Sequence, residues 1–600
     1  MWNEVQWIKI PDMELRNKQI LHGDLGGRFA YFRLEQELPA DARLTARITA
    51  VSRYRLWVND QAVLSGSCKG DLNRQYYETV SLTPYLHAGK NVFAVQVLYN
   101  DPDIARDQTD ERAAIYGVVG AGNCHALAID GDITDAFGRV IGTISTGKAL
   151  WRVWLDHTFY LKSSEYTVYL GATEESVDAR RSPLEWKRLD FDASSWSLAC
   201  ASGPVMPSAL FQSVGLIPRV HLMPREIPLM EETESAFARV IRRKNDLVLD
   251  AGVEVNGYPR FSFNGNAGTE ITVTYLERFG NGADGARIDD MGGTVEGRAD
   301  HIILNGHLVN YEPFWVRTFR YIVVKSSDGK LPEMPAAQVY RKTGYPLSVE
   351  STVDSSTPWV GQLWGICLRT LQNCMLETYM DCPYYEQLQF IMDTRLQMLF
   401  TYAVSRDARL AKKALLDFHC GMRPEGLLPG KTPTAYCQVI STFSLHYVYA
   451  LWEYVEHTGD LALGRCYRTD IDRILDYYES KRDETGLVGK ITPWAFMDWQ
   501  DDWKDLSGVS PAYFEGSSTI INLMYAWALA CGAKLYEATG RPGTAMEYRV
   551  WKFSKKCELC ASTRKQECSA KVRIAGSLPD TPRPGRSSMD CLIPPRAAQR

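Results

Sequence analysis

Residues 360–375 read Val-Gly-Gln-Leu-Trp-Gly-Ile-Cys-Leu-Arg-Thr-Leu-Gln-Asn-Cys-Met, and here the hydrophobic pattern of the chain changes. Apolar residues recur at intervals of three and four, as on one face of an α-helix. The face comprises Val360, Leu363, Trp364, Cys367, Leu368, Leu371, Cys374 and Met375. Helical periodicity continues from this segment to residue 551.

Three helical hairpins are predicted after this leading helix. Their helices span 384–404 with 408–419, 440–457 with 461–479, and 516–538 with 543–551. In the second hairpin Gly459 suits a helix C-terminus and Asp460 the next N-cap, and Gly540 and Pro542 have comparable places in the third. The sequence therefore predicts seven helices.

Before residue 350 the apolar residues alternate with a period of two. Candidate strands are 46–52, 54–58 and 91–98, then 271–275, 301–304 and 319–324. This spacing predicts two antiparallel β-sandwich domains, residues 1–204 and 205–350, ahead of the helical domain at 351–551.

The composition excludes several classes of protein. Of 600 residues, 45% are apolar and 23% charged, which is typical of globular chains. A net charge of −5 does not favour a nucleic-acid or anionic-membrane partner. The longest nearly apolar run, 523–533, is too short to span a bilayer. The charged first 25 residues lack a signal-peptide core, so a cytoplasmic location with reduced cysteines is expected.

No cofactor or metal ion is expected. The glycines at 117–122 do not form the GxGxxG motif of dinucleotide-binding sites. Cys557 and Cys560 have the spacing of half a zinc site, but no second pair follows them.

Three carboxylates gather in Asp381-Cys-Pro-Tyr-Tyr-Glu386-Gln-Leu-Gln-Phe-Ile-Met-Asp393-Thr-Arg395. On a helix that starts at 384, Glu386 and Asp393 would point the same way two turns apart, with Asp381 just outside its start. Crowded carboxylates raise the pKa of one member, which then serves as a general acid. The structural alternative is that Asp381 and Glu386 only compensate the helix dipole.

A second cluster lies between the second and third hairpins. Three tryptophans, Trp494, Trp499 and Trp503, fall within ten residues and alternate with aspartates. Aromatic faces stack on sugar rings and carboxylates accept hydrogen bonds from hydroxyls, so we expect Asp498 and Trp499 to form a sugar subsite. The alternative is a packed tryptophan-rich loop.

The segment 381–395 resembles the signature of bacterial α-L-rhamnosidases, inverting glycoside hydrolases with a six-hairpin α/α toroid. Residues 54–59, 311–321, 426–429 and 438–445 resemble other parts of that family, so the likeness extends over about 25–550. It implies an incomplete (α/α)6 toroid after the two β-sandwiches, and hydrolysis of terminal α-L-rhamnosyl residues from glycosides or oligosaccharides.

The resemblance also implies residue roles. Glu386 matches the general acid, and Asp381 and Asp393 match sugar-contacting carboxylates. Tyr385 and Phe390 stand where the commoner form has Arg and Trp, and Met392 replaces a glycine. Two alternatives therefore stay open: a toroid glycosidase with another sugar specificity, and a non-catalytic carbohydrate-binding remnant.

The C-terminal region motivates the second alternative. Six hairpins need twelve helices, and residues 552–600 form a basic, proline-rich and aperiodic tail that we expect to be disordered. In the family the general base lies downstream of the helices counted here, so we predict a truncated chain of weak or absent activity. Glu515 or Asp502 could in principle substitute for that base, but neither matches a family position.

Overall fold

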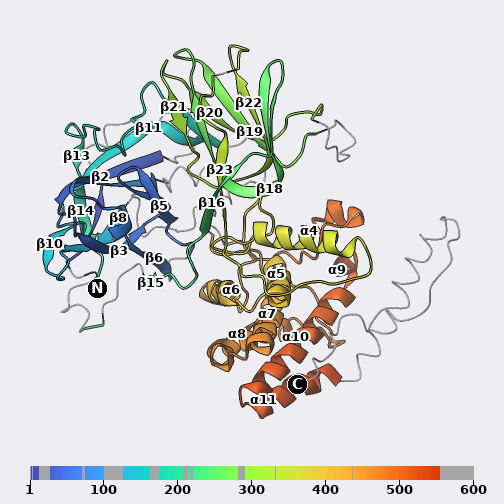
Figure 1. Cartoon of the computed structure of the whole chain (residues 1–600). Helices are drawn as coiled ribbons and strands as arrows, with labels where there is room; N and C mark the ends of the chain where they lie inside the picture. The colour runs from blue at the N-terminus through green and yellow to red at the C-terminus, as the bar shows by residue number, and fades with distance from the viewer. Residues whose placement is uncertain are drawn as a thin grey trace.

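The computed structural model describes most of the chain up to residue 553 (Figure 1). The described residues are 2, 4–11, 28–70, 74–99, 126–162, 174–206, 214–215, 221–280, 291–331, 333–434 and 437–553. The predicted disordered tail, the glycines at 117–122 and the cysteine pair at 557 and 560 lie outside these ranges, apart from residues 552 and 553, which end the last helix.

The described β-region consists of two sheets. The smaller sheet has the order β10-β9-β3-β8-β1-β14; β6 also pairs with β3, and β15 pairs with β6. Its strands are β1 (Gln6–Lys9), β3 (Arg43–Ala50), β6 (Gln75–Ser81), β8 (Leu127–Asp130), β9 (Asp132–Thr134), β10 (Val140–Thr143), β14 (Cys200–Pro204) and β15 (Leu222–Pro224). A short 3-10 helix, η1 (Thr83–Tyr85), follows β6.

The larger sheet has the order β16-β23-β18-β22-β19-β20-β12-β11-β2-β7-β4-β5. These strands are β2 (Arg28–Leu38), β4 (Tyr54–Val58), β5 (Gln61–Gly66), β7 (Gly89–Tyr99), β11 (Arg152–Lys162), β12 (Glu174–Asp178), β16 (Glu231–Ala236), β18 (Asp246–Phe263), β19 (Glu270–Leu276), β20 (Arg298–Ile303), β22 (Arg317–Ser326) and β23 (Val339–Gly344). Three short strands attach to it: β13 (Ser197–Leu198), β17 (Arg239–Arg242) and β21 (Val309–Tyr311).

The six strands expected from the alternating pattern are all present, and pairing is largely antiparallel as predicted. The structure adds that the larger sheet continues from the first β-region into the second. The junction is the parallel pair β12 and β20, in which Ser176 lies opposite His301. The two β-regions are therefore joined by backbone hydrogen bonds and share the core cluster that contains Phe29 and Phe319.

Each of the seven predicted helices is present, although the second begins later than predicted. They are α4 (Val360–Asn373), α5 (Ile391–Val404), α6 (Arg409–Cys420), α7 (Phe443–Thr458), α8 (Leu461–Glu479), α10 (Thr519–Ala538) and α11 (Pro542–Phe553), with the short η3 (Asp501–Leu506) and α9 (Ala512–Glu515) between α8 and α10. The hairpins are α5 with α6, α7 with α8, and α10 with α11. Because α7 packs against both α5 and α10, the three hairpins lie in a row. Two β-regions followed by an incomplete toroid confirm the predicted fold class.

The predicted caps of the second hairpin are confirmed. Gly459 ends α7 in the left-handed conformation with φ +72°, and its N–H donates to the Val455 carbonyl at 2.9 Å. The Asp460 carboxylate accepts from the Leu463 N–H at 3.0 Å, as an N-cap does. In the third hairpin Gly540 has φ +81° and Pro542 is the first residue of α11.

The start of the second helix is a correction. Residues 381–390 form a loop, and α5 begins at Ile391 rather than at 384. Gln387 has φ +56°, a left-handed conformation that no helix interior contains. Glu386 and Asp393 consequently do not share one helical face, and Pro383 belongs to a turn. Asp393 lies in the first turn of α5.

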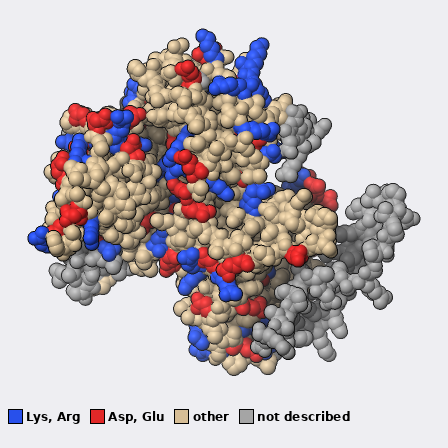
Figure 2. All heavy atoms as spheres, viewed as in Figure 1, with Lys and Arg blue, Asp and Glu red and all other residues tan. Residues whose placement is uncertain are grey.

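The leading helix is buried only at its C-terminal end. Leu371, Cys374 and Met375 are in the core, whereas Leu363 and Ile366 are exposed. Helix α10 likewise exposes Leu523 and Trp527. No helix within the described ranges combines the length and hydropathy needed to cross a membrane. On the visible face acidic and basic side chains are interspersed (Figure 2).

Candidate active site

The loop 381–390 is fixed by the second β-region. Thr318, on β22, donates its hydroxyl to the Pro383 carbonyl at 2.7 Å, and the Trp315 Nε1–H donates to Gln387 Oε1 at 2.9 Å. The buried Arg298 guanidinium donates to the carbonyls of Tyr384 and Tyr385. These bonds hold the turn that carries Glu386 against the sheet.

The loop is also closed by its own hydrogen bonds. The Asp381 N–H donates to the Leu388 carbonyl at 2.8 Å, and Asp381 Oδ1 accepts from the Leu388 N–H at 3.0 Å. The Gln387 side-chain amide donates to the Pro383 carbonyl at 2.8 Å. The other oxygen, Asp381 Oδ2, accepts from the Cys382 thiol at 3.1 Å. The Asp381 carboxylate therefore closes the loop, a structural role different from the helix-dipole compensation considered from the sequence.

Three of the predicted carboxylates interact electrostatically. Burial, and to a lesser extent the negative charges of Asp381 and Asp498, raise the pKa of Asp393 to about 6. Burial also raises the pKa of Asp381. The charge of Asp498, from the connection between the second and third hairpins, thus acts on Asp393 of the motif.

Glu386 lies in the adjoining turn and is half-buried, with its N–H directed at Cys382 Sγ at 3.4 Å. The two substitutes considered for the general base, Asp502 and Glu515, are exposed, the first in η3 and the second at the end of α9. The chemical roles of these three residues stay predictions.

Trp499, which follows Asp498 in the chain, presents an aromatic surface. Its side chain is 58% exposed, while its ring is supported by Phe496 at 5.1 Å and Trp494 at 6.3 Å between centroids. The Asp498 carboxylate accepts from the Trp499 N–H at 2.7 Å. Trp494 instead has a structural role in a packed loop, as the alternative proposed, because its indole N–H donates to the Ser507 carbonyl at 2.9 Å. Trp499 is available to a ligand.

A chain of aromatic rings links the motif to this platform. The ring centres of Phe390 and Phe443 lie 6.4 Å apart, and those of Phe443 and Phe496 lie 5.8 Å apart. Phe390, one of the positions where this sequence departs from the commoner family form, therefore packs between the loop and α7. Apolar walls of this kind favour the neutral form of the nearby carboxyls.

Sequence reasoning missed the residues that position the site. Trp315, Thr318 and Arg298 hold the loop from the β-region, and Arg395 forms a two-point ion pair with Glu453 on α7, at 2.6 and 2.9 Å. Arg395 and Trp315 stood in the segments that resemble the family, but only the folded chain shows what each one contacts. Among the described residues, no three His, Cys, Asp or Glu side chains are grouped to hold a metal ion.

Comparison with known proteins identifies the family. Residues 348–556 match the bacterial alpha-L-rhamnosidase 6 hairpin glycosidase domain, and residues 241–340 match the bacterial alpha-L-rhamnosidase concanavalin-like domain. An alpha-L-rhamnosidase of Formosa agariphila is 20% identical in an alignment of 549 positions that covers 84% of this chain and 53% of that protein. The chain therefore spans about half the length of this curated relative.

Solved structures share the fold. A GH78 family rhamnosidase of Bacillus sp. GL1 superposes with a TM-score of 0.71 at 17% identity, covering 93% of this chain and 76% of that one. The α-L-rhamnosidase of Streptomyces avermitilis, solved with L-rhamnose, has a TM-score of 0.65 at 18% identity, covering 88% and 48%. With two family domains matched over more than half of its residues, the chain belongs to the bacterial α-L-rhamnosidase family.

Proposed function

We propose that this chain is an α-L-rhamnosidase-like glycoside hydrolase that acts on terminal α-L-rhamnosyl residues of glycosides or oligosaccharides. The observation that supports the proposal is the electrostatic effect of Asp381 and Asp498 on the buried Asp393, together with the exposed ring of Trp499, which follows Asp498 in the chain. Carboxylates that accept from sugar hydroxyls, beside an aromatic face that stacks on a sugar ring, are a suitable pyranose subsite.

In this proposal Glu386 donates the proton to the glycosidic oxygen as the bond breaks. Its position depends on the β-region, because Trp315, Thr318 and Arg298 hold the turn on both sides of it. Asp381, Asp393 and Asp498 bind and orient the sugar. An inverting reaction also needs a second carboxylate about 6.5–9.5 Å from the acid to activate water. Asp502 and Glu515 are the candidates within the described residues.

The test is hydrolysis of a panel of aryl glycosides by the unaltered chain and by Glu386→Gln. Turnover of the α-L-rhamnoside alone, with a loss of about 10²–10⁴-fold in the variant on an unactivated substrate, is the expected result. An aryl substrate with a good leaving group should lose much less, because it needs little protonation. Glu350→Gln, at an exposed glutamate paired with Arg406, is the matched control.

Other outcomes distinguish the alternatives. Turnover of a different glycoside would assign another sugar specificity. L-rhamnose binding without any turnover would identify a carbohydrate-binding remnant. A loss of less than about fivefold in Glu386→Gln, or equal losses on both leaving groups, would remove Glu386 from the role of acid.

A further inference from the structure

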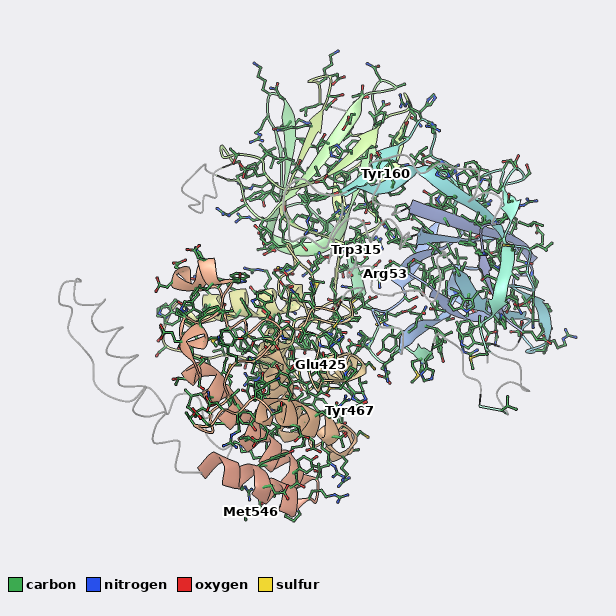
Figure 3. The ribbon with its side chains drawn as sticks, turned by 180° about the vertical axis from the view of Figure 1, so that it is seen from behind. Arg53, Tyr160, Trp315, Glu425, Tyr467 and Met546 are labelled. Atoms are coloured by element: carbon green, nitrogen blue, oxygen red, sulfur yellow. The ribbon has the colours of Figure 1, made fainter. Side chains whose placement is uncertain are left out.

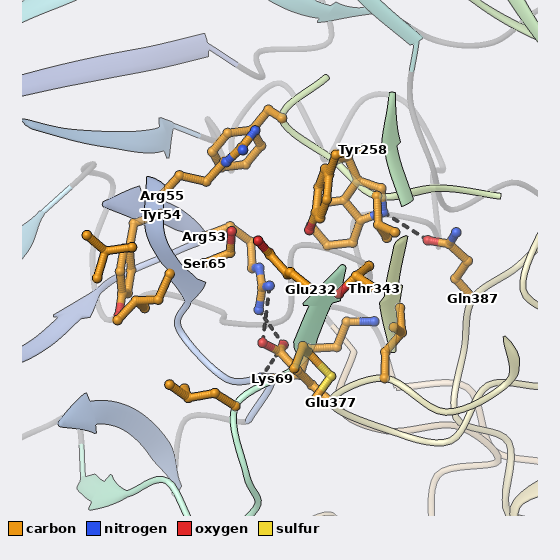
Figure 4. A pocket seen from close by; sticks show the side chains of 18 residues that line it. Arg53, Tyr54, Arg55, Ser65, Lys69, Glu232, Tyr258, Thr343, Glu377 and Gln387 are labelled. Carbon is orange, nitrogen blue, oxygen red and sulfur yellow. Dashed lines mark hydrogen bonds and ion pairs between the residues drawn. The ribbon is translucent and has the colours of Figure 1, made fainter. Parts of the chain in front are cut away.

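A second cavity lies where the two β-regions meet the segment 376–387. Figure 3 shows Arg53 and Trp315 side by side at this junction, and the Arg53 guanidinium lies 5.5 Å from the centre of the Trp315 ring. The cavity measures about 160 Å³, and none of Asp381, Glu386, Asp393, Asp498 and Trp499 lines it. It is therefore a different site from the candidate active site (Figure 4).

Nearly all charges on the cavity wall are neutralised within the protein. Glu377 is paired with Arg53 and also with Arg225, at 3.3 Å. Arg55 pairs with Glu312, which lies behind the wall. Glu232 pairs with Arg341 in the same way. Each of these guanidinium groups consequently has its counter-charge.

Lys69 is the exception within the part of the chain that the structure describes. Only 7% of the residue is exposed, and its ammonium lies 5.8 Å from the centre of the Trp315 ring. Its backbone N–H donates to Glu377, but no carboxylate of the described residues lies within ion-pair distance of its ammonium. Burial and the positive charge of Arg53 together lower the pKa of Lys69 to about 8, against a smaller opposite effect of the Glu377 charge.

The uncharged part of the wall is aromatic and aliphatic. Tyr258 and Trp315 supply ring faces, and Leu229, Phe314 and Leu376 supply apolar surface. A cavity of about 150 Å³ is large enough to hold a benzene-sized molecule. A buried cation without a partner is costly, and a bound anion removes that cost.

We propose that this cavity binds a small monocarboxylate with an apolar ring, whose carboxylate pairs with the Lys69 ammonium and whose ring lies against Trp315 and Tyr258. One unpaired cation matches one negative charge, which favours a monocarboxylate over a multiply charged phosphate. The apolar walls favour a hydrocarbon ring over a ring that carries several hydroxyls, whose hydrogen bonds to water would be lost.

The probe is benzoate, with benzyl alcohol as its uncharged analogue and glucuronate as a hydroxylated carboxylate of similar size. Calorimetric titration of the full chain should show benzoate binding, and Lys69→Met should weaken it by about 30-fold or more, because a buried charge pair is removed. Benzyl alcohol should bind the variant and the unaltered chain equally. Glucuronate should bind more weakly than benzoate.

Lys187→Met is the matched control. Lys187 also lies over a tryptophan, with its ammonium 4.7 Å from the centre of a Trp57 ring, but it lies outside this cavity and near Asp60. Its substitution should leave benzoate binding unchanged. Equal benzoate affinity in Lys69→Met, no binding to the unaltered chain, or a preference for glucuronate would overturn the proposal.

A measurement on the unaltered chain covers the case in which Lys69→Met does not fold. In a lysine NMR titration Lys69 should be recognised by its pKa of about 8, and bound benzoate should raise that pKa. An unchanged Lys69 pKa at saturating benzoate would refute the site. Neither experiment depends on glycoside turnover, so its outcome is independent of the proposed function.

Discussion

The Trp315 indole N–H lies 2.9 Å from the Oε1 of Gln387, the residue that directly follows Glu386. Both side chains are buried, and Gln387 has the left-handed φ of +56°. The position of the proposed acid is therefore set by a hydrogen bond from a different domain of the protein. A non-glycine residue in this conformation costs energy, so the loop depends on such contacts to keep its shape.

Trp315→Phe tests this dependence, because it keeps an aromatic ring but removes the donor. We expect kcat on an unactivated rhamnoside to fall about tenfold with little change in KM, because proton donation requires a correctly placed acid. The free energy of unfolding should fall by about 1 kcal/mol. Steady-state kinetics and urea unfolding measure the two effects.

Trp151→Phe is the control for Trp315→Phe. The Trp151 indole is equally buried and donates to the Ile144 carbonyl at 2.9 Å, far from the loop. It should show the same loss of stability with unchanged kcat. Equal kinetic effects in both variants would contradict a positioning role for Trp315.

Asp393→Asn should stabilise the protein at neutral pH. The pKa of Asp393 is about 6 in the folded chain against 3.8 for the unperturbed group, so the folded state holds its proton more tightly. The stability due to this proton is present below about pH 4 and is lost as the pH rises through 6. The variant, which has no charge to bury, should gain up to about 3 kcal/mol near pH 7 and nothing near pH 4.

Urea unfolding of the variant and the unaltered chain at both pH values measures this difference. Asp328→Asn is the control, because Asp328 is exposed and its pKa is lowered by hydrogen bonds from Ser326 and Lys330. It should give no gain near pH 7. If the stability difference between Asp393→Asn and the unaltered chain does not change with pH, the folded structure does not disfavour the charged form of Asp393.

Trp499→Ala should weaken L-rhamnose binding without destabilising the fold. The ring is largely exposed, so its loss removes little buried area, whereas ring stacking is worth about 0.5–1.5 kcal/mol. We expect the Kd for L-rhamnose, measured by calorimetry, to rise by about three- to tenfold. Trp154→Ala, at a tryptophan on β11 that is 38% exposed, should not change it. An unchanged Kd in Trp499→Ala would exclude the platform from the sugar site.

The exposed apolar stripes of α4 and α10 should cause self-association. Trp359, Leu363 and Ile366 lie along one face at the start of α4, and Leu523 and Trp527 lie along one face of α10. Each of these side chains is between 47% and 59% exposed. Contiguous apolar surface of this kind promotes association. Sedimentation velocity should show concentration-dependent species that Leu363→Glu combined with Leu523→Glu reduces.

Phe137→Glu controls for the added charge. Phe137 is an exposed aromatic residue in a turn of the first β-region, and such single exposures are ordinary. Its substitution should leave the association unchanged. A single monomeric species for the unaltered chain at all concentrations would refute the prediction.

The sequence predicted the elements whose shape depends on near neighbours. The change of period at residue 360, the capping pair Gly459 and Asp460, and the alternating strand 91–98 are all found in the structure. Helix caps and strand alternation act over a few residues, so they are visible in the sequence itself. The family resemblance of 381–395 indicated which carboxylates to examine.

Tertiary contacts decided the rest. Local pattern placed residues 384–390 in a helix, but Thr318 and Arg298 bond the backbone carbonyls of residues 383–385 that a helix would otherwise pair. Trp315 bonds the side chain of Gln387, and together these contacts hold the segment in a loop.

The effect of the Asp498 charge on Asp393, and the unpaired Lys69 at the junction of three segments, also emerged only in the folded chain. The sequence alone determined the elements and the chemical groups available to them. Burial and electrostatic coupling are sums over residues far apart in the chain, and therefore only the tertiary structure determined which of those groups meet and which of their charges remain uncompensated.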